Sequence, residues 1–121
     1  MTRDFDLIRK ILIAVQAEPA GSVLYSVNID NEYNENVVNE HIDLLVDGGL
    51  LKGQVLRPLD EIVSFTVYGL TWQGHDFIQA TGNETLWNKA GDIVKDKGGA
   101  ITFDLLKELV TSLARNALGL P

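Results

Sequence analysis

The chain has 121 residues, 45% of them apolar, and this length suits one domain with a buried core. It contains no Cys, which excludes a disulfide framework, a thiolate nucleophile and Cys-ligated zinc or iron–sulfur centres. The formal net charge is −7, and residues 1–83 hold the whole surplus, with 12 acidic and 5 basic side chains. Such a field repels nucleic acid and anionic lipid and attracts basic protein surfaces, although solubility alone is a sufficient reason for it.

The first predicted element is an amphipathic helix from Asp4 to Ala17, with Asp4 as N-cap. Its apolar residues form one stripe: Leu7, Ile8, Ile11, Leu12 and Val15. Pro19 and Gly21 end it. Two acids precede the stripe, unlike a signal peptide, and no apolar run approaches the roughly 20 residues of a membrane span. We therefore expect a cytoplasmic protein that does not enter a membrane.

The segment from Ser22 to Tyr33 is predicted to contain a short strand. Val23, Tyr25, Val27 and Ile29 alternate with other residues at a period of two, which is typical of a strand. A standard winged helix has its second helix at this point of the chain, so helix remains the alternative. Residues 30–34 then form a turn.

The next predicted helix runs from Glu35 to Asp47, with Asn34 as N-cap and two glycines at its end. Two predicted strands follow, Leu50–Arg57 and Ile62–Tyr68, joined by a turn over residues 58–61. The pair forms a β-hairpin, which is the candidate wing of a winged helix.

Three further helices are predicted in the C-terminal third. Thr71 caps the first, a second follows Asn83, and Thr102 caps the last. Gly98 and Gly99 separate the last two. The predicted fold class is therefore α+β: a winged-helix-like domain over residues 1–82, with a two-helix extension over residues 83–121. This extension either packs on the domain or mediates a homodimer.

Several blocks of the sequence carry a family resemblance. They are Arg3-Asp4 with residues 7–12, residues 38–51, the block Leu70-Thr71-Trp72-Gln73-Gly74-His75-Asp76-Phe77, and, more loosely, residues 87–89, 97–99 and 103–107. In these blocks the chain resembles the YjcQ-like family of small bacterial and phage proteins of unknown function. The resemblance implies a winged-helix-like fold and a frequent prophage setting, and it implies no activity.

The predicted helix over residues 35–47 lies where a winged helix carries its DNA-reading helix, yet it has acids and no Lys or Arg. A DNA reader meets phosphates and base edges and normally uses basic residues there. We therefore predict a non-enzymatic protein-interaction module that docks a partner with a basic surface. The candidate partner-binding residues are Glu35, Asn36, Asn39, Glu40, Asp43 and Asp47. The alternative for this face is a helix surface that is merely solvated.

The second hypothesis for function is a DNA-binding transcriptional regulator of the winged-helix class. It would have to use the basic residues near the wing and the N-terminus: Lys52, Arg57, Arg3, Arg9 and Lys10. These residues are few, so binding of nucleic acid is the less favoured expectation.

No catalytic, cofactor or metal site is predicted. The sequence has no Gly-x-Ser-x-Gly elbow and no phosphate loop. His41 and His75 each adjoin a carboxylate but lack the spacing that puts two ligands on one helix face, so structural roles are expected. Trp72 and Trp87 are expected to pack in the core rather than anchor an interface.

Overall fold

The computed structural model describes residues 1–30, 32–60, 64–99 and 101–121. Within these residues it has five α-helices and a two-stranded antiparallel sheet, which confirms the α+β class. The chain divides into two compact units, Met1–His75 and Asp76–Pro121, so the division falls inside a helix. The interpretation of residues 83–121 as a separate extension stays a prediction.

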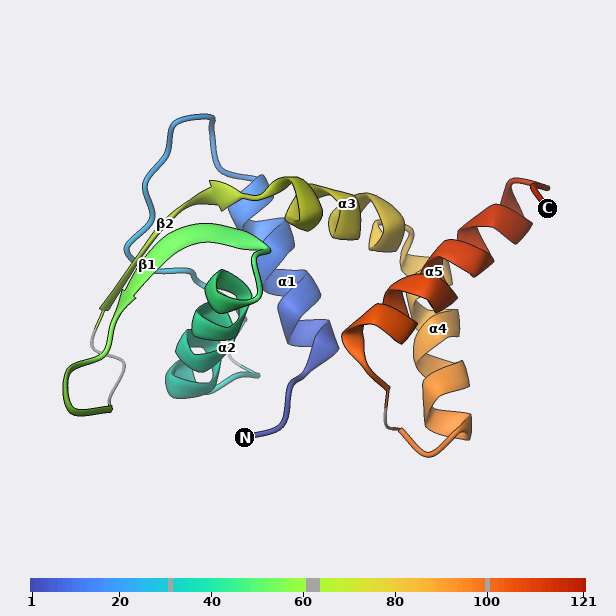
Figure 1. Ribbon diagram of the computed structural model, residues 1–121, viewed down its shortest axis with the longest axis horizontal. Helices are drawn as coiled ribbons and strands as arrows, with labels where there is room; N and C mark the ends of the chain where they lie inside the picture. Colours follow the sequence, from blue (N-terminus) through green and yellow to red (C-terminus); the bar gives the residue numbers. More distant parts are fainter. Residues whose placement is uncertain (31, 61–63, 100) are drawn as a thin grey trace. The chain divides into compact units, whose positions relative to one another are not determined.

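The N-terminal unit contains α1 (Phe5–Gln16), α2 (Glu35–Asp47), β1 (Leu51–Leu56) and β2 (Ser64–Leu70). Figure 1 shows the two helices beside the hairpin; α1 packs on α2 and β2, and α2 packs on β1. The stripe of α1 is buried as predicted, against Val38, Ile42 and Leu45 of α2 and Phe65 and Val67 of β2. This core fixes which face of α2 remains outside.

The helix starts follow the predicted caps. The Asp4 carboxylate accepts a hydrogen bond from the Leu7 N–H at 3.1 Å, and the Asn34 side chain accepts one from the Asn36 N–H at 2.8 Å. These bonds satisfy backbone donors that have no partner inside the helix. The hairpin pairs β1 with β2 in antiparallel order, from Leu51 opposite Leu70 to Leu56 opposite Ser64. A short 3-10 turn, Pro58–Asp60, follows β1, and Ile62 lies outside the described residues.

The predicted strand in residues 22–33 is wrong apart from one position. Leu24 and Val67 exchange backbone hydrogen bonds of 2.8 Å as an isolated bridge. Among the described residues, the backbone of residues 25–29 then has no backbone hydrogen-bond partner. Asp30, at the end of this segment, forms an ion pair with Lys10 of α1 at 3.1 Å. The alternating pattern is present, but among the described residues of this segment only Leu24 pairs with a strand.

The C-terminal unit contains the end of α3 (Trp72–Thr81), α4 (Glu84–Asp96) and α5 (Phe103–Ala117). Phe77 stacks on Phe103 at 5.1 Å between ring centroids and meets Trp87 edge-on at 6.2 Å. Ala90 of α4, three residues after Trp87, is also buried. In α5 the buried residues are Leu106 and Val110, four residues apart. The described part of the chain has no helix with the length and apolar character that a membrane crossing requires.

Candidate functional site

The exposed face of α2 carries the predicted partner-binding residues. Glu35, Asn36 and Asp47 are exposed, and Asn39, Glu40 and Asp43 are half-buried. The spacing of residues 36, 39, 40, 43 and 47 places them on one side of the helix, opposite the buried Val38, Ile42 and Leu45. The last turn of α2 has no basic residue, so Asp47 lies unfavourably near the negative end of the helix dipole.

Arg57, at the end of β1, binds two of these acids. One guanidinium nitrogen lies 2.8 Å from the Glu40 carboxylate and 2.9 Å from that of Asp43. The hydrogen bonds that Arg57 donates to Asp43 and, less strongly, to Glu40 raise the pKa of Arg57 above its ordinary value. A residue predicted to contact DNA is thus held by two residues predicted to contact a protein partner. The sequence analysis missed this cluster, because only the hairpin brings residue 57 back to α2.

Most of the other predicted nucleic-acid residues also have intramolecular partners. Lys10 lies 3.1 Å from Asp30, and this hydrogen bond raises the pKa of Lys10. Arg9 is buried in α1, and the Arg3 guanidinium lies 5.4 Å from the centroid of the Phe5 ring. Lys52 is exposed and has no ion-pair partner within the part of the chain described. Of the five basic residues, Lys52 is thus the exposed one that has no partner among the described residues.

His41 has the structural role that was expected, and its side chain is fully buried rather than at the flank of the apolar stripe. The Nδ1 atom of His41 lies 2.8 Å from the Val37 carbonyl oxygen. Its Nε2 accepts a hydrogen bond of 2.9 Å from the backbone N–H of Asp4. This pattern fits the neutral ring with its proton on Nδ1. His41 thereby ties the N-cap of α1 to α2.

Thr71 and Gly74 both lie in tight contact with the end of α2. Thr71 donates from its N–H to the Leu50 carbonyl at 3.1 Å and from its hydroxyl to the Gly49 carbonyl at 2.6 Å. The same hydroxyl accepts from the Gly74 N–H at 3.0 Å, as an N-cap does. A Cβ at position 74 would collide with the Leu50 carbonyl oxygen. Thr71 and Gly74 therefore join the start of α3 to the end of α2.

Trp72 contradicts its predicted packing role, whereas Trp87 confirms it. Trp87 is buried against Phe77, but 80% of Trp72 is exposed. Trp72 is the first residue of α3, and the Thr71 contacts fix that helix start so that position 72 faces solvent. The second histidine, His75, is also exposed. Within the described ranges, no group of three or more His, Asp or Glu side chains is arranged to hold a metal ion.

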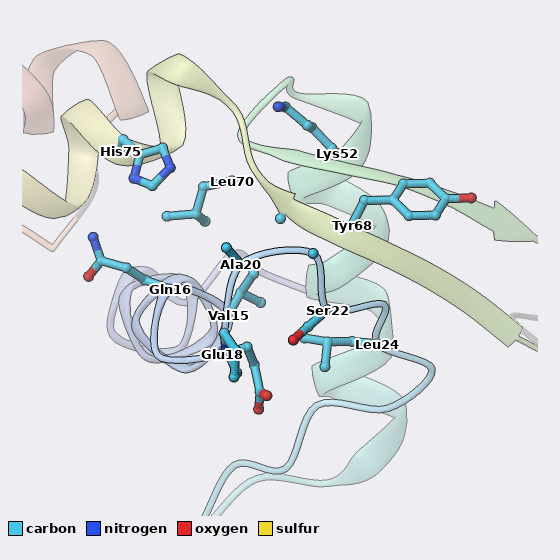
Figure 2. Close-up of a pocket in the computed structure, with 13 residues that line it drawn as sticks. Val15, Gln16, Glu18, Ala20, Ser22, Leu24, Lys52, Tyr68, Leu70 and His75 are labelled. Carbon is cyan, nitrogen blue, oxygen red and sulfur yellow. The ribbon is translucent and has the colours of Figure 1, made fainter.

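Two of the cavities formed by the described residues lie in the N-terminal unit. One, of about 420 Å³, lies beside the first half of α2 and is lined by Glu35 and Asn39 on one side and by residues 25–29 on the other. The other, of about 440 Å³, lies between the end of α1, residues 18–22 and the sheet (Figure 2). Lys52 and His75 are among its lining residues.

Comparison with known proteins gives a family without an assigned activity. Residues 2–100 match the family described as "Hypothetical protein (DUF2513)". A protein of Haemophilus influenzae described as "Uncharacterized protein" is 32% identical over 122 residues, which cover 98% of this chain and 99% of that protein. No solved structure matches the chain significantly. The expectation of a family of unknown function is confirmed, and the YjcQ-like affiliation stays a prediction.

Proposed function

The chain belongs to the DUF2513 family of hypothetical proteins, and from this premise we propose that it is a non-enzymatic protein-interaction module. It has a winged-helix-like scaffold of bacterial or phage origin, and it docks a basic partner protein through the exposed face of α2. Its setting is the cytoplasm. The proposal assigns no cofactor and no catalytic residue.

The order of elements supports this scaffold. A helix comes first, Leu24 then bridges to β2, α2 follows, and the β1–β2 hairpin comes after it. The extended segments lie in the order Leu24, β2, β1. The described residues before α2, 22–30 and 32–34, contain no helix, whereas a helix-turn-helix has at this point the helix that supports its recognition helix. A reading helix without that support is poorly suited to a DNA groove and remains usable as a protein-binding face.

The observation that carries the proposal is the cluster of Arg57 with Glu40 and Asp43. In this intramolecular contact two carboxylates of α2 accept hydrogen bonds from one guanidinium, at the charge-assisted distances of 2.8 and 2.9 Å. Glu35 and Asp47, at the two ends of the helix, have no ion-pair partner among the described residues. An arginine or lysine of a partner therefore finds two free carboxylates and two more that already favour a guanidinium.

The groove beside α2 adds apolar contact area to the acidic face. Tyr25 and Tyr33 line it together with Glu35 and Asn39, and Tyr25 is largely exposed. Tyrosines are enriched among the residues that dominate binding energy at protein interfaces. A partner with basic residues flanking an apolar side chain fits this combination.

The alternative, a DNA-binding regulator, has weaker support. Arg57 and Lys10 are paired with acids, and Arg9 is buried. DNA contact through Arg57 would leave Glu40 and Asp43 without their cation, close to the phosphates. Titration with duplex DNA at about 50 mM and about 200 mM salt tests this alternative, because phosphate contacts weaken steeply with salt.

The test of the proposal is a quantitative pull-down with the full chain as bait. Two double variants remove the acidic face: Glu40→Lys with Asp43→Lys, and Glu35→Lys with Asp47→Lys, which leaves the Arg57 cluster intact. The control, Asp92→Lys with Glu108→Lys, makes the same change in net charge at exposed positions of α4 and α5. We expect the partner to be captured by the wild type and the control and lost from both α2 variants.

If the control loses the partner as completely as the α2 variants do, the interaction depends on net charge alone. If all variants capture the partner equally well, α2 is not part of the interface. Thermal unfolding of each variant distinguishes loss of binding from loss of fold.

A further inference from the structure

We infer that the cavity of about 440 Å³ at the end of α1 binds a small molecule that carries one carboxylate on an apolar body. This inference does not depend on the acidic face of α2. The volume lies within the range of small-molecule sites, roughly 300–1,000 Å³. The site combines a concave apolar floor with a few polar groups at its edge, which is the usual composition of such sites.

The floor consists of core side chains. Val15 from α1 and Leu70 from β2 are buried, and Leu24, the bridge residue, is half-buried. The backbone of residues 19–22 passes over them (Figure 2). Since Leu24 is fixed to Val67 by two hydrogen bonds, the wall is already formed before any ligand enters. An apolar ring or short chain in this space would cover carbon surface that now faces water.

A single free cation stands at the edge of this floor. In the N-terminal unit, Lys10 and Arg57 are paired with acids, Arg9 is buried, and Arg3 lies over a ring. Lys52 has no such partner among the described residues, and it lines the cavity. An ammonium beside an apolar surface attracts an anionic group with an apolar body, because each part of that ligand gains its own contact.

His75 completes the anion-binding side. Figure 2 shows Lys52 and His75 above Leu70, with the His75 ring turned toward Leu70 and the exposed Lys52 side chain extending upward from the rim of the cavity. An imidazole has at least one N–H to donate in either protonation state. Gln16 and Ser22, across the cavity, add an amide and a hydroxyl.

The charged groups of the lining limit the charge of the ligand. Glu18 belongs to the lining, but its carboxylate extends away from the centre in Figure 2. With Glu18 directed outward, Lys52 is the one cation of the lining and balances one negative charge, so a phosphate or a dicarboxylate would bring more charge than Lys52 balances. The ligand class is therefore a monocarboxylate.

The experiment is titration of the ¹⁵N-labelled full chain with benzoate and hexanoate, and with benzamide and hexanamide as their uncharged counterparts. We expect saturable shifts of the amides of residues 20–22 and 68–70 with at least one carboxylate, and binding at least tenfold weaker for its amide. Lys52→Met should weaken binding at least tenfold and His75→Gln severalfold. Lys89→Met, an exposed lysine of α4, is the matched control and should have no effect.

The inference is overturned if neither carboxylate shifts these amides at millimolar concentration. It is equally overturned if the amides bind as well as the acids, or if Lys52→Met and Lys89→Met behave alike. Because Lys52 and His75 are exposed, their variants should fold, and the unchanged spectrum of the remaining residues verifies this.

Discussion

The guanidinium of Arg57 lies 2.9 Å from the carboxylate of Asp43, although 14 residues separate them in the chain. Each residue was assigned by the sequence to a different function, one to DNA and the other to a protein partner. Their contact makes the two functions compete for the same atoms. A partner that supplies its own cation has to displace Arg57 or bind beside it, and DNA has to draw Arg57 away from two acids.

The first prediction concerns this competition. Arg57→Ala should increase capture of a basic partner severalfold, because Glu40 and Asp43 lose their internal cation. Arg57→Lys should give an intermediate result, since a lysine keeps the charge but not the forked guanidinium. Unfolding temperatures should change little, as exposed ion pairs contribute little to stability. Reduced capture by Arg57→Ala would instead make Arg57 part of the interface.

The buried His41 should be essential for stability. His41→Ala removes the acceptor for the Asp4 N–H and leaves a cavity between α1 and α2, so we expect a loss of roughly 2–4 kcal/mol. His75→Ala, at an exposed position, should leave the unfolding free energy unchanged. Urea unfolding followed by circular dichroism measures both. Similar effects of the two changes would contradict the assigned hydrogen bonds.

Gly74→Ala should disrupt the junction between α2 and α3. The added methyl group meets the Leu50 carbonyl oxygen, so we expect destabilisation of roughly 1–3 kcal/mol. Gly91→Ala is the opposite case, because a Cβ there meets no neighbouring atom in the described structure. In the middle of α4 that change should stabilise by roughly 0.5–1 kcal/mol. If both variants change the free energy of unfolding in the same direction, the close approach of the chain at position 74 is refuted.

Asp47→Lys should separate stability from binding. It places a cation at the C-terminal end of α2, where the helix dipole favours positive charge, and we expect a gain of about 0.3–1 kcal/mol. Partner capture should fall at the same time. Chemical unfolding and the pull-down test the two effects independently, and a more stable variant with undiminished capture would exclude Asp47 from the interface.

The two tryptophans should differ in their access to solvent. In Trp72→Phe only the buried Trp87 remains, and its fluorescence should be quenched by acrylamide severalfold less than that of the wild type. If partner binding covers α3 as well as α2, the wild-type emission should shift to shorter wavelength. Strong quenching in Trp72→Phe would contradict the packing of Trp87 on Phe77.

The helices were predictable because their signals are local. Asp4, Asn34 and Thr102 each lie next to the apolar stripe that they cap, and all three cap helices in the structure. The hairpin followed from two β-rich runs with a turn between them. Residues 22–33 show the limit of this approach: their period of two is a local pattern, whereas strand pairing is non-local, and among the described residues only Leu24 pairs with β2.

The candidate site was predictable only in part. Most of the acidic face follows from helical spacing: Asn36, Asn39, Glu40, Asp43 and Asp47 lie on one side of α2, whereas Glu35 lies off that side, near the angular position of the buried Ile42. Its contact with Arg57 depends on the path of the hairpin, and the exposure of Trp72 depends on the bonds of Thr71 to the end of α2. Both are non-local, so neither spacing nor composition could indicate them.

The isolated bridge at Leu24 has a consequence for how the chain tolerates insertions. One residue added within positions 26–29 would break no backbone hydrogen bond among the described residues, so it should cost little. One residue added at Thr66 would shift the register of β2 and turn Phe65 or Val67 out of the core. Variation in length among natural sequences should therefore gather just after the bridge and be absent from the strand that it joins.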